Sequence, residues 1–362
     1  MRTCNRCLCF TLVVTLIIVV VLSYLLNSIK DSTVPSNILI RQTECNNYSR
    51  PIIFIGGMPR SGTTLMRAIL DSHPLVRCGE ETRVVPRILS MRSAWKKQTV
   101  EWNRLIAGGI SENILDSAVR AFVYEILVRH GGPDADILCD KDPFVLKHAV
   151  YVTTIFPNSK FLLLIRDGRA VIHSVMTRKV TITGFSLTDY KQNLKSWNQG
   201  IDVMVKECTK IGDSNCLFVY YEQLVLHPRV TIEKILKFLN IPWVDSVLHH
   251  DELIDKKISL SKTEHSSDQV IKPINLEALT RWVGHVPDNV KNEIDTLAPM
   301  LKQLGYDTKS DNPSYGTADS LVIENTNNIK RNISYWNERM KQYDRKMSNT
   351  TSIASVKTLT VL

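Results

Sequence analysis

The sequence has no excess of acidic residues and no internal repeats. Its 36 Asp and Glu residues face 45 Lys and Arg, so the 362-residue chain carries a formal charge of +9. That balance favours anionic partners, which include nucleic acids, anionic lipids, nucleotides and acidic peptides. With 44% apolar and 22% charged residues, the composition excludes a disordered or fibrous chain and allows one large globular domain or two small ones.

Charged residues are also missing between Arg6 and Lys30. A helix over the apolar run at 8–26 would span roughly 28 Å, close to the thickness of the hydrocarbon core of a bilayer. Because Arg2 and Arg6 precede this run, the positive-inside rule leaves residues 1–7 in the cytosol and most of the chain on the other side, as in a type II membrane protein. A cleaved signal peptide is the alternative, but its apolar region is usually shorter, and no convincing small-residue cleavage site follows.

No Cys-x-x-Cys pair follows the apolar run, which argues against a zinc site, the alternative use of the cysteines. Five cysteines would be luminal, where disulfides persist: Cys45, Cys78, Cys139, Cys208 and Cys216. Cys208 and Cys216 close a short loop and are the easiest pair to propose. Cys78 with Cys139 is a plausible second pair, which leaves Cys45 odd. Three glycosylation sequons agree with a luminal address: Asn47, Asn332 and Asn349.

Beyond a polar stem at 27–50, buried strands alternate with helices. Short β-branched apolar runs predict strands at 52–57, 158–168 and 216–224. Apolar residues at helical spacing, and the stretches between the strands, predict helices at 63–73, 111–130, 188–209 and 228–240. This alternation predicts an α/β domain at 51–306 with a mostly parallel central sheet flanked by helices. Because apolar residues become sparse later, we expect 307–362 to be a poorly packed, flexible surface tail.

The loop after the first strand has the spacing of a phosphate-binding loop. Gly57, Gly62 and Thr64 match G-x-x-x-x-G-K-[ST], between a strand and a helix whose N-terminus attracts anions. The alternative is a plain turn that uses glycines for its geometry. The lysine of a nucleoside triphosphatase is missing, and Arg60 supplies the cation instead. No strand ends in a clear Mg²⁺-binding Asp, so kinase or ATPase chemistry fits poorly, and a less charged ligand such as a 5′-phosphosulfate fits better.

Four motifs in order resemble the tyrosylprotein (protein-tyrosine) sulfotransferases: PRSGTTL, GEETRVVPR, IRDGRA and SSDQVIKPINLEAL. The similarity runs from about 51 to 306. It implies a sulfotransferase fold related to the P-loop nucleoside triphosphatases, with 3′-phosphoadenosine 5′-phosphosulfate (PAPS) as donor and no metal. It also implies a luminal domain anchored in the Golgi membrane, a homodimer, and acidic tyrosine-containing segments of secretory proteins as acceptors.

The resemblance assigns the donor site residue by residue. The 5′-phosphosulfate would be held by Arg60, Ser61, Gly62, Thr63 and Thr64. The 3′-phosphate would be held by Arg166, Ser174 and Arg178, of which the last two are i, i+4 neighbours on a helix. The adenosine would be held by Tyr221, Ser266, Lys272, Asn275 and Arg281, although the family usually has Lys at the last position. Taken singly, each of these arginines could be a solvated surface charge.

The resemblance also assigns the catalytic residues. A tyrosine hydroxyl has a pKa of about 10, so it must lose its proton as it attacks sulfur. Glu81 is the expected base rather than Glu80, although either could simply pair with a nearby arginine. Lys141, Ser266 and Arg60 would stabilise the charge that develops on the leaving phosphate. Alternatively, Lys141 is a surface ion pair with the aspartates on either side of it.

Three arginines near the expected base predict acidic acceptors: Arg83, Arg87 and Arg104. The alternatives are a carbohydrate sulfotransferase with the same donor, and a membrane-anchored binding protein without activity. Direct in-line transfer is expected, since no Ser–His or Cys–His arrangement that would form a covalent sulfo-enzyme is visible. Nucleic acid is not an expected partner, because no recognisable nucleic-acid-binding module is present.

Overall fold

The computed structural model of the chain describes residues 48–132, 135–261 and 264–358, with side chains up to residue 346. The expected cytosolic segment at 1–7, the anchor at 8–26 and most of the stem at 27–50, with Cys45 and Asn47, lie outside these residues. The side chain of Asn349 also lies outside them. Within the described ranges, no helix is both long enough and apolar enough to span a bilayer. The anchor at 8–26 therefore stays a prediction.

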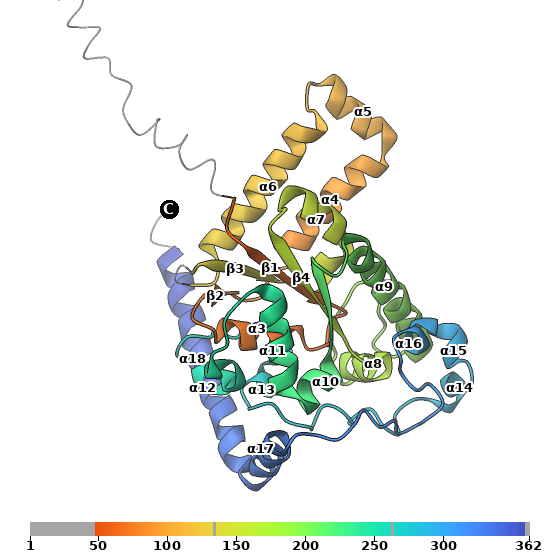
Figure 1. Cartoon of the computed structure of the whole chain (residues 1–362), viewed down its shortest axis with the longest axis vertical. Helices are drawn as coiled ribbons and strands as arrows, with labels where there is room; N and C mark the ends of the chain where they lie inside the picture. The colour runs from red at the N-terminus through yellow and green to blue at the C-terminus, as the bar shows by residue number, and fades with distance from the viewer. Residues whose placement is uncertain (1–47, 133–134, 262–263, 359–362) are drawn as a thin grey trace, which may run out of the picture. The chain divides into compact units, whose positions relative to one another are not determined.

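Five parallel strands form the central sheet, in the order β2-β3-β1-β4-β5 (Figure 1). Their bounds are β1 Ile52–Gly57, β2 Val76–Arg77, β3 Ile137–Lys141, β4 Ser159–Ile165 and β5 Cys216–Tyr220. The parallel α/β prediction is thus confirmed. The sequence analysis missed β2, which is very short, and β3, in which Asp140 and Lys141 interrupt the apolar run. It also extended the last strand too far, because Tyr221 already begins a helix.

Helices cover both faces of the sheet. In chain order the first ones are α3 Thr63–Asp71, α4 Val84–Lys97, α5 Thr99–Ala107, α6 Glu112–Arg129, η1 Pro143–His148, α7 Ala149–Ile155, α8 Gly168–Thr177, α9 Tyr190–Ile211, α10 Tyr221–Leu226 and α11 Pro228–Leu239. The later ones are η2 Asp245–Leu248, α12 His250–Leu253, α13 Ser267–Val270, α14 Asp288–Lys291, α15 Ile294–Leu297, α16 Pro299–Gln303, α17 Ser320–Arg331 and α18 Ile333–Thr358. The predicted helices correspond to α3, α6, α9 and α11 within a few residues.

Alternate side chains of β1 feed two separate cores. Ile53 and Ile55 pack with Ile69 of α3 and Ile232 of α11, on the face that these helices cover in Figure 1. Ile52 and Phe54 pack on the opposite face with residues of α7, α8 and α9. Because both faces are buried, this strand is apolar throughout, as is typical of a central strand in a parallel sheet.

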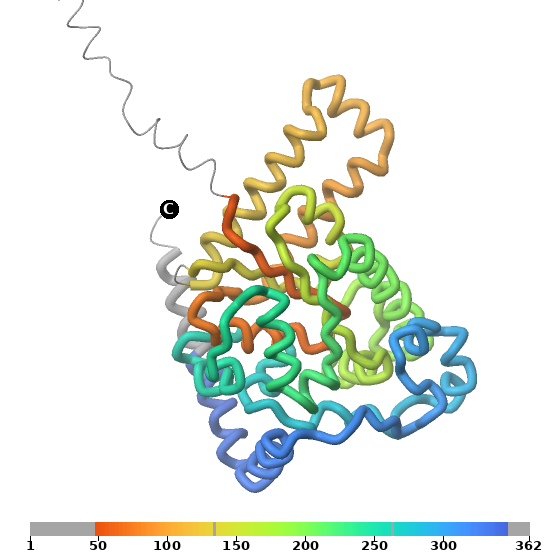
Figure 2. Tube along the Cα trace, viewed as in Figure 1, coloured from red at the N-terminus to blue at the C-terminus, as the bar shows by residue number. Residues whose placement is uncertain are grey.

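The prediction of a flexible tail at 307–362 is wrong for its described part. Helices α17 and α18 are well-formed, and α18 packs beside residues 254–260 (Figure 2). Their buried apolar side chains recur every seven residues, at Val322, Ile329, Trp336 and Tyr343. The Tyr343 hydroxyl accepts a hydrogen bond of 2.8 Å from the backbone N–H of Leu260. One apolar contact per two helical turns gives a low apolar density, which is why the pattern resembled a surface tail.

Both expected disulfides are present. Cys78, just after β2, is bonded to Cys139 in β3. Cys208, near the end of α9, is bonded to Cys216 at the start of β5. Each therefore ties a helix or strand end to the sheet on which the site is built.

Candidate active site

The loop between β1 and α3 has the geometry of an anion site. Gly62 has a φ of 98°, and a Cβ there would lie 2.4 Å from the ring of Tyr221, so only glycine fits. The chain then enters α3, whose first backbone N–H groups have no helical partner. The hydroxyl of Ser61 is buried and has no hydrogen-bond partner within the described part of the chain. Such an orphaned donor beside a helix N-terminus fits an anionic ligand.

Arg60 projects from this loop into a cluster of cations. Its Nε donates to Ser174 Oγ at 3.0 Å, its Nη1 donates to Ser266 Oγ, and its Nη2 donates to Gln269 Oε1 at 3.1 Å. Arg166 donates to the Arg60 backbone oxygen at 2.8 Å. Burial, together with the charges of the neighbouring arginines, lowers the pKa of Arg60 to about 10. Guanidinium groups are gathered this closely where an anion is to be bound.

All the expected donor residues that follow the loop converge on two adjoining hollows, each of about 50 Å³, that share Arg166. The first is lined by Tyr221, Ser266, Lys272 and Asn275, in addition to loop residues. The second is lined by Ser174, Arg178 and Arg281. These arginines are therefore not isolated surface charges. The guanidinium of Arg166 lies over the ring of Tyr221, with its carbon 4.5 Å from the ring centroid.

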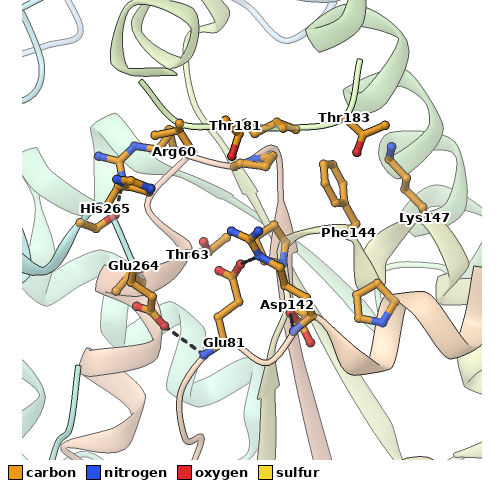
Figure 3. A pocket seen from close by; sticks show the side chains of 18 of the residues that line it. Arg60, Thr63, Glu81, Asp142, Phe144, Lys147, Thr181, Thr183, Glu264 and His265 are labelled. Carbon is orange, nitrogen blue, oxygen red and sulfur yellow. Dashed lines mark hydrogen bonds and ion pairs between the residues drawn. The ribbon is translucent and has the colours of Figure 1, made fainter. Parts of the chain in front are cut away.

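A larger cavity of about 540 Å³ adjoins the first hollow, with Arg60, Gly62, Thr64 and Ser266 lining both. Glu81 lines this cavity, whereas Glu80 is not among its lining residues (Figure 3). Lys141 Nζ donates to Glu81 Oε2 at 2.8 Å, and Arg83 Nε donates to Glu81 Oε1 at 2.9 Å. The expected base Glu81 thus lies in a cavity that is large enough for a second substrate and that adjoins the first hollow.

Lys141 is not a surface ion pair with its flanking aspartates. Its side chain is fully buried at the end of β3, and its ammonium is held between Glu81 and Glu264. It does not line the cavity but supports the carboxylate of Glu81 from within. The parallel pairing of β3 with β1 brings it beside the phosphate-binding loop.

The sequence analysis missed Glu264, which is buried and accepts hydrogen bonds from Lys141 Nζ at 2.9 Å and from the Glu81 backbone N–H at 3.0 Å. Burial raises the pKa of Glu264, but the charge of Lys141, then that of Arg67 and these hydrogen bonds, outweigh burial and bring the pKa to about 2. Only its position two residues before Ser266 could have pointed to it.

Asp142 was also missed as a site residue. Its carboxylate accepts a hydrogen bond of 2.8 Å from the backbone N–H of Arg83, which has a left-handed φ of 59°, and one of 3.3 Å from Thr82 Oγ1. It therefore fixes the loop that carries Glu81. Burial, reinforced by the nearby charge of Glu81, raises the pKa of Asp142 to about 7.

Of the three arginines expected to bind the acceptor, Arg83 and Arg87 line the large cavity. Arg104 does not. It lies on α5, which projects from the sheet in Figure 1, with 72% of its side chain exposed and an ion pair to Glu101 at 2.8 Å. The sequence analysis grouped it with Arg83 and Arg87 because it follows them along the chain, but α5 lies away from the sheet in Figure 1. Lys147, which the sequence analysis did not single out, lines the cavity instead.

Comparisons with known proteins agree with this geometry. A family model described as "Sulfotransferase family" matches residues 51–245. The chain is 54% identical over 303 residues to protein-tyrosine sulfotransferase A of Caenorhabditis elegans, covering 84% of this chain and 80% of that protein. It is 56% identical over 286 residues to protein-tyrosine sulfotransferase 2 of Gallus gallus, covering 78% and 77%, respectively.

Among solved structures, the sulfotransferase domain from the curacin biosynthetic pathway is similar in fold. It superimposes with a TM-score of 0.51 at 21% identity and covers 71% of this chain and 98% of that domain. This similarity supports the fold, and the sequence relatives define the family more narrowly. The chain belongs to the protein-tyrosine sulfotransferase family.

Proposed function

We propose that this protein transfers a sulfuryl group from PAPS to the hydroxyl of tyrosines that lie near acidic residues in secretory proteins. The observation that carries the proposal is the position of Glu81, in a large cavity that shares Arg60 and Ser266 with the predicted donor hollow. A base and a set of anion-binding donors that meet at one boundary suit transfer between two bound substrates.

The residues divide the chemistry between them. Glu81 takes the proton as the tyrosine oxygen forms its bond to sulfur and the bond from sulfur to the phosphate oxygen breaks. Arg60 and Ser266 donate to the oxygen that gains charge, and adenosine 3′,5′-bisphosphate leaves. Lys141 holds the carboxylate of Glu81 at 2.8 Å. A role of Lys141 at the leaving phosphate requires its ammonium to turn from that carboxylate.

Charge on the cavity wall supports acidic acceptors. Arg83 and Arg87 stand on the wall beside Glu81. Guanidinium groups bind carboxylates well and repel no anionic peptide, whereas a neutral sugar offers them no carboxylate to bind. We therefore favour a tyrosine acceptor over the carbohydrate alternative.

The cellular setting is part of the same proposal. The apolar run at 8–26 would anchor the enzyme in the Golgi membrane as a type II protein, with Asn332 exposed for glycosylation between α17 and α18. For the homodimer, support comes from apolar side chains that are exposed on α5 and at the start of α6: Val100 is 72%, Ile106 47%, and Ile114 52% exposed.

The test is sulfuryl transfer by the detergent-purified full chain. Labelled PAPS is supplied with an acidic tyrosine peptide or with a panel of sugars, with and without chelator. Glu81→Gln should lose about 10²- to 10⁴-fold in kcat, the usual contribution of a positioned base. Glu80→Gln is the matched control and should keep wild-type activity, since Glu80 does not line the cavity. Label on sugar alone, or equal losses in the two variants, would refute the proposal.

A further inference from the structure

Lys147 is a cation on the wall of the large cavity that the proposed chemistry does not use. It belongs to η1, the short helix that follows Asp142. Its Nζ lies 4.3 Å from the centroid of the Phe144 ring. Figure 3 shows the two side chains next to each other, on the side of the cavity away from Arg60 and His265. Lys147 does not line either of the donor hollows.

No carboxylate within the described ranges forms an ion pair with Lys147. In contrast, Arg83 on the same wall is paired with Glu81, and Arg104 on α5 is paired with Glu101. Lys147 is only partly exposed, and burial lowers the pKa of its ammonium. A partly buried cation without a counter-charge is unfavourable for folding, so its place on the cavity wall is better explained by an anion that arrives with the substrate.

Neighbouring groups cannot supply that counter-charge. Glu81 and Glu264 are both engaged by Lys141, and Asp142 accepts from the loop at Arg83. His148 is hydrogen-bonded to Ser90 Oγ at 3.1 Å. Burial, and then the charge of Lys147, lowers the pKa of His148 to about 4, so this imidazole stays neutral. Lys147 therefore brings to this end of the cavity a positive charge that none of these neighbouring groups balances.

We infer that Lys147 is a specificity-determining residue whose ammonium pairs with a carboxylate of the acceptor close to the target tyrosine. This inference rests on the proposed function and deepens it. Phe144 limits the positions open to the ammonium, so the pair is directional. Lys147 reads a different carboxylate from Arg83 and Arg87, because it projects from η1 while they belong to the start of α4.

The experiment is a cycle between enzyme and peptide variants. Wild type, Lys147→Met and Lys147→Arg are assayed with an acidic peptide that has one tyrosine, and with derivatives in which each acid is replaced singly by its amide. Lys206→Met is the control, since Lys206 is 73% exposed on α9 and paired with Asp202. Binding of adenosine 3′,5′-bisphosphate, measured by thermal shift, reports whether each variant is folded with an intact donor site.

With the parent peptide, Lys147→Met should lose about tenfold in kcat/KM, mostly through KM, while nucleotide binding stays unchanged. One acid-to-amide change that is harmful to wild type should become neutral in Lys147→Met, and Lys147→Arg should restore its effect. Equal losses with every peptide, or no loss, would overturn the role of Lys147 while leaving the proposed function intact. If wild type transfers no sulfuryl group to tyrosine, the proposed function itself fails, and this inference fails with it.

Discussion

Replacing Glu264 by Gln tests how the loop that carries Glu81, the proposed base, is held. Glu264 is buried and is the second carboxylate on Lys141, and it also accepts the backbone N–H of Glu81. Gln keeps the shape and one acceptor oxygen but removes the negative charge. The buried ammonium of Lys141 is then left with Glu81 as its one anionic partner.

The size of the effect follows from proton linkage. The pKa of Glu264 falls from an ordinary 4.5 to about 2. At roughly 1.4 kcal/mol per unit, this corresponds to about 3 kcal/mol of folding free energy. Because the folded pKa is lowered, this stabilisation is complete above about pH 4.5 and is lost as the pH falls towards 2. The remaining hydrogen bonds of Gln will reduce the measured loss somewhat.

The assay is urea unfolding with the disulfides intact, for wild type and Glu264→Gln, from pH 7 down to pH 4. We expect the variant to be less stable by about 2–3 kcal/mol at pH 7. Glu112→Gln is the matched control: its carboxylate is 42% exposed and is paired with Lys96 and with the buried Arg92, so it should lose less than about 1 kcal/mol. Turnover should also fall about tenfold, with nucleotide binding unchanged, because a neutral amide holds the Lys141 ammonium and the Glu81 backbone N–H less firmly than the carboxylate does, so the proposed base is less well positioned. A loss at pH 7 no larger than that of the control would refute this reasoning.

Replacing Arg83 or Arg87 by Ala should raise KM for an acidic peptide at least about tenfold (~1.4 kcal/mol) and leave nucleotide affinity within twofold, whereas Arg104→Ala should change neither. Equal loss of both affinities would contradict the assignment. Burial raises the pKa of Asp142 and of Glu222 to about 7, so their contribution to stability is complete below about pH 4 and is lost as the pH rises through 7. The thermal midpoint should therefore be higher at pH 6 than at pH 8, and a midpoint that rises towards pH 8 would contradict this. Replacing Cys78 and Cys139 by Ser should lower the free energy of unfolding by about 4 kcal/mol, against about 2.5 kcal/mol for Cys208 and Cys216, because the first disulfide closes a longer loop. Equal losses in urea unfolding would argue against this entropic account.

The sequence by itself was enough wherever the physical cause is local. A run of apolar residues that ends in glycines makes β1 and the phosphate-binding loop, because backbone freedom and burial act over a few neighbouring residues. The same is true of helices α3, α6, α9 and α11 and of the disulfide that joins Cys208 to Cys216, which are only 8 residues apart. The four family motifs predicted a set of donor residues, and those that follow the loop line two adjoining hollows in the structure.

Only the tertiary structure decided which side chains form hydrogen bonds and ion pairs with the proposed catalytic residues. Lys141 and Glu264 are 123 residues apart, and Arg60 and Ser266 are 206 apart, so no periodicity could join them. The exclusion of Arg104 from the cavity and the packing of α17 and α18 likewise depend on where whole helices lie. The physical reason is that local patterns report which side chains are apolar or charged, whereas the free energy of a buried charge depends on the few groups that folding brings within hydrogen-bond distance.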